Sequence, residues 1–240
     1  MRIGLLQCDH VSDELFDSHG DYQDMFSDLL HVQDEDIEVA IYDLTADHFP
    51  VDLHACDGYI ITGSQFSVYD DIPWIPKAKE LVANLYEAKV PTIGICFGHQ
   101  LIAESLGGKV KKAEDKGWGV GIHHWDVKSP KDWMGNTPPT NFTMCFSHQD
   151  QVVEMPEDSN LIAASDFCPI AAFQIGESVL TFQGHPEFSK EYTQALIEKR
   201  FDIIGKDVST AGIESLKQDV DADTVCSWMV GFIKKSQSVS

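Results

Sequence analysis

Short apolar runs alternate with amphipathic segments in the first part of the chain. Four runs rich in Ile, Leu and Val and bounded by Gly, Asp or Pro predict buried strands at residues 2–8, 37–44, 58–62 and 91–95. Between them, apolar side chains recur at helical spacing in residues 22–32 and 75–88. Strands that alternate with helices predict an α/β fold with a mostly parallel sheet, covered by helices on both faces.

The pattern changes after residue 107. Short or alternating apolar segments separated by turn signals predict a β-rich second half, with strands at residues 120–127, 142–146, 151–155, 161–164, 170–175 and 179–182. After Phe188 helical periodicity returns, at residues 191–201, 214–220 and 223–235. We expect one domain over residues 1–188 and a C-terminal helical extension, residues 189–240, packed on it.

Charge and cysteine usage narrow the class of protein. The chain has 17 basic and 39 acidic residues among 240, a formal charge of −22, so we expect no binding to nucleic acid or to anionic membranes. No apolar stretch reaches the roughly 18 residues of a membrane helix, and the amino terminus lacks the layout of a signal peptide. Six cysteines without paired spacing predict reduced thiols, and we expect a cytoplasmic protein.

The stretch GICFGHQ, residues 94–100, follows the strand predicted at residues 91–95. A tight turn from a parallel strand into a helix exposes one side chain above the sheet, and Gly94 and Gly98 are small enough for that turn. The helix amino end favours a thiolate. Cys96 is therefore the candidate nucleophile, and the alternative is a buried packing cysteine.

A thiol nucleophile needs a base and a group that orients the base. Among ten histidines, His185 is the best candidate because the segment QGHPE, residues 183–187, also follows a predicted strand. Glu187 lies two residues further on and can accept a hydrogen bond from the imidazole. Alone, H-P-E is a weak motif.

GICFGHQ together with GHPE some 90 residues later resembles the class I, triad-type glutamine amidotransferase family. The resemblance spans about residues 2–188 and implies a flavodoxin-like α/β fold. Within the family, the chain looks most like free-standing members that are similar to the amidotransferase half of GMP synthetase and to plant γ-glutamyl peptidases. It implies the triad Cys96, His185 and Glu187. The further residues that it implies are an oxyanion hole from the amides of Gly63 and Phe97 and substrate contacts from Gln100, Ser147, His148 and Gln149.

The chemistry that the resemblance implies is cleavage of a γ-glutamyl C–N bond through a cysteine thioester, with a small γ-glutamyl substrate. It requires no metal or cofactor. The pair His123–His124 is a poor metal site because adjacent strand side chains point to opposite faces. His185-x-Glu187 lacks the P-C-x-x-C of zinc deaminases, and Gly107-Gly108-Lys109 lacks the spacing of a phosphate loop.

Three functions remain open. The chain can be a self-sufficient γ-glutamyl hydrolase that acts on glutamine or peptides. It can instead be a glutaminase subunit that supplies ammonia to a separate synthase partner, since it shows no nucleotide-binding motif of its own. A catalytically silent homologue that binds a ligand or regulates another protein is the alternative outside enzymes, and the complete Cys96, His185 and Glu187 set argues against it.

Overall fold

A nine-stranded sheet forms the centre of the protein in the computed structural model, which describes residues 1–113 and 115–237. Its strand order is β2-β1-β3-β4-β11-β10-β9-β6-β7. The first five strands in that order are parallel to one another, and the remaining ones pair antiparallel. The strands are β1 (Arg2–Gln7), β2 (Glu38–Asp43), β3 (Gly58–Ile61), β4 (Thr92–Ile95), β6 (Gly119–Val127), β7 (Asn141–His148), β9 (Ser159–Ala164), β10 (Ala172–Ile175) and β11 (Val179–Phe182).

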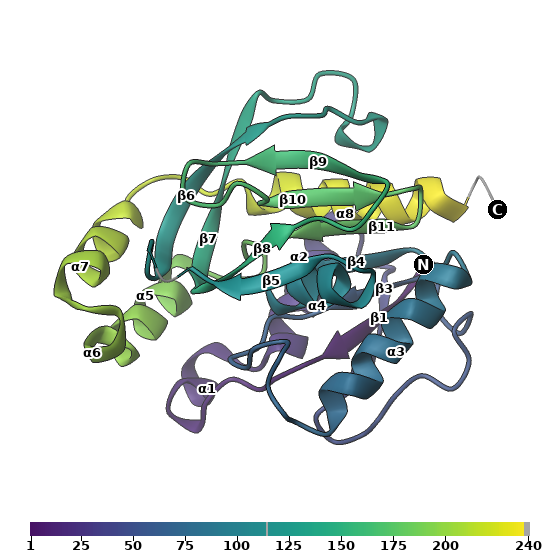
Figure 1. Ribbon diagram of the computed structural model, residues 1–240, viewed down its shortest axis with the longest axis horizontal. Coiled ribbons are helices and arrows are strands. Elements are labelled where there is room, and N and C mark those ends of the chain that lie inside the picture. Colours follow the sequence, from purple (N-terminus) through teal and green to yellow (C-terminus); the bar gives the residue numbers. More distant parts are fainter. Residues whose placement is uncertain (114, 238–240) are drawn as a thin grey trace.

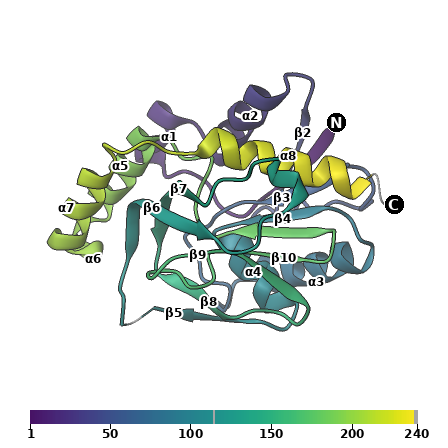
Figure 2. The same ribbon diagram turned by 90° about the horizontal axis from the view of Figure 1, so that it is seen from above.

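Helices cover both faces of the parallel half (Figure 2). One face carries α2 (Tyr22–Gln33) and the carboxyl-terminal α8 (Ala222–Gln237), and the other carries α3 (Trp74–Glu87) and α4 (Phe97–Ser105). Strands β3 and β4 are buried along their whole length. The apolar runs of the sequence therefore form a sheet enclosed on both sides, which confirms the predicted α/β class.

Shorter elements complete the fold (Figure 1). A second sheet pairs β5 (Lys109–Lys112) with β8 (Asp150–Glu154) and packs beside α4. The helices α5 (Lys190–Lys199), α6 (Phe201–Ile204) and α7 (Lys206–Ser215) gather at the β6–β7 end of the main sheet. Two exposed or short elements, α1 (Asp13–His19) and the 3-10 turn η1 (Asp132–Met134), remain.

The prediction of a helix at residues 214–220 is wrong. The structure ends α7 at Ser215, and the chain then turns so that the Asp221 carboxylate accepts hydrogen bonds from the backbone and hydroxyl of Thr143 on β7, at 2.8 and 2.9 Å. The observed helix, α7, has no apolar repeat, and Gly212 packs directly against Val120. Close backbone contact, which needs small residues, replaces the usual apolar stripe there.

Two elements were missed because their sequences carry little apolar signal. Helix α1 has no buried residue, and β5 has a single buried residue, Val110, between lysines. All six cysteines are unpaired and buried. Within the described residues, none of the helices combines the length and the apolar character that crossing a bilayer requires.

Candidate active site

Three adjacent parallel strands end at the same edge of the sheet. Ile61 of β3 lies beside Gly94 of β4, and Ile95 of β4 lies beside Phe182 of β11. The residues that follow these strand ends are Gly63, Cys96 and His185. The topology thus brings Gly63, more than 30 positions before Cys96, and His185, nearly 90 positions after it, to the sheet edge where α/β proteins place their ligands.

Cys96 stands at a sharp turn into α4. Its φ of 51° and ψ of −98° are unusual for a residue with a side chain. The turn is tight because a Cβ at Gly94 would lie 2.5 Å from the Gly98 carbonyl oxygen, and a Cβ at Gly98 would lie 2.5 Å from the carbonyl oxygen of Ile61. The two glycines are therefore required by close backbone approach, as expected for a nucleophile turn.

His185 lies between Cys96 and Glu187. Its Nδ1 donates to Glu187 Oε1 at 2.7 Å, and the ring also hydrogen-bonds to Cys96. The imidazole stacks on Phe188 with ring centroids 3.8 Å apart, and its backbone NH donates to the Cys145 carbonyl at 2.9 Å. The position of the ring is thus fixed through its stacked face, its backbone and the carboxylate.

The charges around His185 favour its protonated form. Burial by itself lowers the pKa of an imidazolium, but the charges of Glu187 and Cys96 and their hydrogen bonds outweigh that effect and raise the pKa of His185 to about 10. Glu187 is itself buried, with its side chain fully covered. This arrangement suits an imidazolium beside a thiolate, with a proton ready for donation.

A glutamine that the sequence reasoning did not single out also contacts the sulfur. Gln183 Nε2 donates to Cys96 Sγ at 3.5 Å, and its Oε1 accepts from Gln100 Nε2 at 3.1 Å. Gln100 also donates to the Asp150 carbonyl at 2.8 Å. The Gln100 amide therefore holds Gln183 and the loop around Asp150, and Gln183 supplies a side-chain donor to the nucleophile.

Gly63 lies against the same pair of side chains. A Cβ built there would lie 2.7 Å from His185 Cε1 and 3.7 Å from Cys96 Cβ, so only glycine fits without displacement. In the described part of the chain, neither the Gly63 NH nor the Phe97 NH has a hydrogen-bond acceptor. Phe97 is the first residue of α4, where backbone NH groups lack partners within the helix.

A pocket of about 370 Å³, here called the Cys96 pocket, opens in front of the nucleophile. Ser147, His148 and Gln149 line it together with Cys96 and Gln100. Burial lowers the pKa of His148 to about 3, so this histidine is neutral, and its Nδ1 donates to the Asp150 carbonyl at 2.9 Å. The residues predicted to contact substrate therefore do border one cavity.

Three charged side chains that line this pocket, Lys112, Asp150 and Arg200, were missed as candidate site residues. Arg200, at the end of α5, donates to Ser147 Oγ at 3.2 Å and lies 5.7 Å from the centre of the Trp118 ring. The Asp150 carboxylate accepts from the hydroxyls of Ser67 and Tyr69 at 2.6 and 2.9 Å. Neither charge forms an ion pair within residues 1–113 and 115–237. The pocket thus presents one cation, Arg200, and one anion, Asp150, that neighbouring side chains hold in place, besides Lys112.

Residues 15–204 match the sequence model of the family described as Glutamine amidotransferase class-I. The chain belongs to this family. Among its relatives, γ-glutamyl peptidase 4 of Arabidopsis thaliana is 31% identical over 188 residues, which cover 76% of this chain and 74% of the plant protein. The alignments span 60 to 80% of the length of four such plant peptidases.

A second kind of relative belongs to a synthase. One subunit of the glutamine-hydrolysing GMP synthase of Methanococcus vannielii is 40% identical over 131 residues, which are 54% of this amidotransferase-family chain and 67% of the relative. Among solved structures, a glutamine amidotransferase of Thermotoga maritima superposes with a TM-score of 0.76 at 17% identity, covering 100% of this chain and 99% of that one. The structural likeness supports the shared fold.

His123, His124 and His99 do not line the Cys96 pocket. His123 stacks on Phe146 with centroids 4.4 Å apart, while His124 Nε2 lies 2.6 Å from the Gln218 side-chain oxygen. His99 is buried, with Nδ1 2.8 Å from Thr181 Oγ1. The described residues include no group of three or more His, Cys, Asp or Glu side chains arranged to hold a metal ion.

Proposed function

We propose that this protein hydrolyses a γ-glutamyl C–N bond, in a γ-glutamyl peptide or in glutamine, through a thioester on Cys96. The observation that carries the proposal is the buried His185, hydrogen-bonded to Glu187 at 2.7 Å on one side and on the other to Cys96, which lines an open pocket. The plant relatives named γ-glutamyl peptidases favour a peptide as substrate.

In the first half of the reaction, the Cys96 thiolate attacks the γ-carbonyl carbon and a C–S bond forms. The negative charge that develops on the carbonyl oxygen is stabilised by the backbone NH groups of Gly63 and Phe97. His185 gives its proton to the departing nitrogen as the C–N bond breaks. The free amine or ammonia leaves, and the γ-glutamyl group remains on the sulfur.

In the second half, water attacks the thioester. His185, now neutral, takes a proton from that water, and the restored imidazolium stabilises the departing thiolate. Glu187 keeps the ring oriented in both steps because its hydrogen bond to Nδ1 leaves Nε2 facing the reaction. Glutamate is released and the starting charges are restored.

Arg200 and Asp150, the two charged side chains that neighbours hold in the Cys96 pocket, fit the other end of the substrate. A γ-glutamyl group carries a free α-carboxylate and a free α-ammonium, and the pocket presents Arg200 and Asp150. Arg200 is held by Ser147 and Trp118, and Asp150 by Ser67 and Tyr69, so binding costs little further ordering of these side chains. Recognition of both charges selects a γ-linked glutamyl group over other amides.

The test is a side-by-side assay of the purified protein on glutamine, glutathione and a set of γ-glutamyl dipeptides, scoring glutamate, ammonia and the released amine. The comparison variant is Cys96→Ala, and the matched control is Cys56→Ala, a buried cysteine that lies away from the Cys96 pocket. We expect turnover that Cys96→Ala abolishes and Cys56→Ala retains. Equal turnover in both variants contradicts the proposal.

A second candidate function rests on the relative from Methanococcus vannielii. If the protein hydrolyses only glutamine, or hydrolyses it only after a synthase is added, it supplies ammonia to a partner enzyme, as the name of that relative suggests for its own complex. A protein that binds γ-glutamyl compounds but turns over none of them, alone or with a synthase, is instead a silent homologue. The same assay, repeated with a synthase added and joined to a binding measurement, distinguishes all three.

A further inference from the structure

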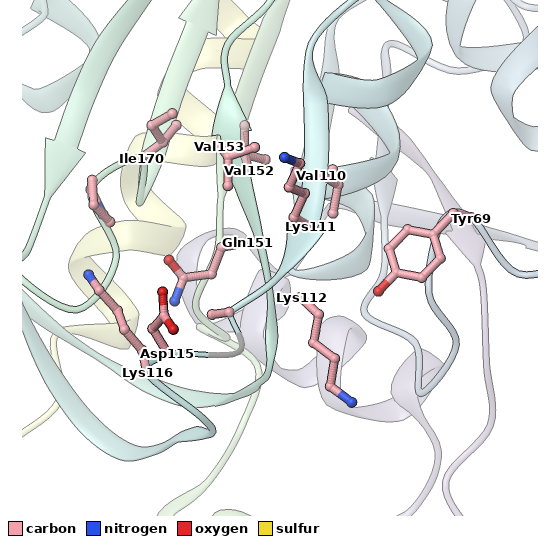
Figure 3. A pocket seen from close by; sticks show the side chains of 12 residues that line it. Tyr69, Val110, Lys111, Lys112, Asp115, Lys116, Gln151, Val152, Val153 and Ile170 are labelled. Carbon is pink, nitrogen blue, oxygen red and sulfur yellow. The ribbon is translucent and has the colours of Figure 1, made fainter.

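A second pocket of about 690 Å³ adjoins the Cys96 pocket, and it has no role in the mechanism described above (Figure 3). Tyr69 and Lys112 line both pockets, so the two are neighbours. The second pocket, here called the β5–β8 pocket, is bordered by strands β5 and β8 and by Pro169 and Ile170. It offers room for a part of the substrate that extends beyond the reacting bond.

The walls of this pocket are apolar and its edge is basic. Val110, Val152, Val153 and Ile170 form the apolar part, and Val153 is 45% exposed. Lysines at positions 111, 112 and 116 line it, in a chain whose formal charge is −22. The acidic residue among its described lining is Asp115. A local excess of positive charge on so acidic a protein favours an anionic ligand.

Two of these lysines are unoccupied. Lys116 donates to the carbonyl oxygens of Asp166 and Phe167, whereas the side chains of Lys111 and Lys112 have no partner in the described part of the chain. Their neighbour Lys109, on the same strand, is paired with Glu154 at 3.1 Å. Lys111 and Lys112 are therefore the cations in this pocket that are free to bind a ligand.

Gln151 is an independent sign of a ligand. Its side chain is turned into the pocket, between Lys116 and Lys112 (Figure 3). The residue is only 4% exposed, yet its amide nitrogen has no hydrogen-bond partner among the residues that the structure describes. A buried donor without an acceptor is costly, and a bound carboxylate removes that cost. Gln151 is paired with Lys111 across β5 and β8, so their side chains share one face of the ladder, whereas Lys112 extends from the other face. The orphan donor and the free Lys111 ammonium are therefore suited to the same chemical group.

We propose that the β5–β8 pocket binds the released portion of a γ-glutamyl peptide, its carboxylate at Lys111 and Gln151 and its apolar side chain against the valines. This inference rests on the proposed function. There, the α-ammonium and α-carboxylate of the glutamyl group bind Asp150 and Arg200, so the amine beyond the scissile bond is the only part that can extend into the neighbouring pocket. Glutamine, which releases ammonia, leaves this pocket empty.

The experiment measures binding to Cys96→Ala by calorimetry, so that no turnover is needed. The ligands are γ-glutamyl-phenylalanine and its carboxamide, which lacks the terminal charge. In the Cys96→Ala background we expect the free acid to bind roughly tenfold more tightly than the carboxamide, and we expect this ratio to fall to near one after Lys111→Gln. Gln151→Leu reduces the ratio in part, and Lys109→Gln is the matched control that preserves it.

An acid-to-carboxamide ratio near one before Lys111 is changed, or a ratio that survives Lys111→Gln, overturns the pocket assignment. Failure of the proposed function gives a different experimental result. In that case the protein with Cys96 intact turns over no γ-glutamyl peptide, while the binding ratio and its dependence on Lys111 still decide what the β5–β8 pocket recognises. Circular dichroism of each variant shows whether a lost ratio comes from a lost fold.

Discussion

The charge of Glu187 should set the alkaline limit of activity. His185 must hold a proton to release the amine. Burial lowers the pKa of His185, but nearby charges and hydrogen bonds raise it from 6.5 to about 10, and the charge of Glu187 is the largest of the causes that raise it. Glu187→Gln removes this charge but keeps an oxygen that accepts from Nδ1. An opposite charge this close changes a pKa by roughly one to three units, so we expect the alkaline limb of kcat/KM to move down by roughly one to two pH units.

The assay is the pH dependence of glutamate release from the best substrate, between pH 6 and the pH at which circular dichroism shows loss of fold. Glu191→Gln is the matched control, because it removes a carboxylate from the exposed first turn of α5. An unchanged limb in Glu187→Gln, or an equal displacement in Glu191→Gln, refutes the claim that the carboxylate acts through His185.

Three further predictions use single substitutions and simple readouts. Gly63→Ala places a Cβ 2.7 Å from His185 Cε1, so we expect kcat to fall at least about tenfold while the circular dichroism spectrum is retained; wild-type turnover argues against the packed site. Arg200→Gln should raise KM for glutamine about tenfold with a smaller effect on kcat, and an unchanged KM excludes Arg200 as the carboxylate anchor. In urea, the free energy of unfolding of Cys96→Gly should be about 1 kcal/mol higher than that of Cys96→Ala, because glycine adopts the φ of 51° at this position without strain. A lower free energy of unfolding for Cys96→Gly shows that the turn is unstrained.

The central sheet could be predicted because its strands are buried on both faces. Continuous apolar runs such as β3 and β4 carry that information within a few residues, and the motif at residues 94–100 marks the end of β4. The parallel order then places the ends of β3, β4 and β11 side by side. The triad candidates are therefore brought together by features that each segment shows locally.

Other features depend on contacts that no local pattern records. Arg200 reaches Ser147 from 53 positions away, and helix position alone does not show that its guanidinium turns into the pocket. Helix α7 was misplaced because its buried positions, Ser209 and Gly212, are small rather than apolar. The β5–β8 pocket depends on strand β5, whose lysines resemble an exposed loop until β8 pairs with them.

A thioester on Cys96 is detected by the intact mass of the protein quenched in acid during turnover of a γ-glutamyl peptide. We expect a population heavier by one γ-glutamyl group, located by peptide mapping to the segment that contains Cys96 and absent in Cys96→Ala. Turnover without any such adduct when chemistry is trapped by rapid mixing, or an adduct on a different residue, would contradict a thioester on Cys96.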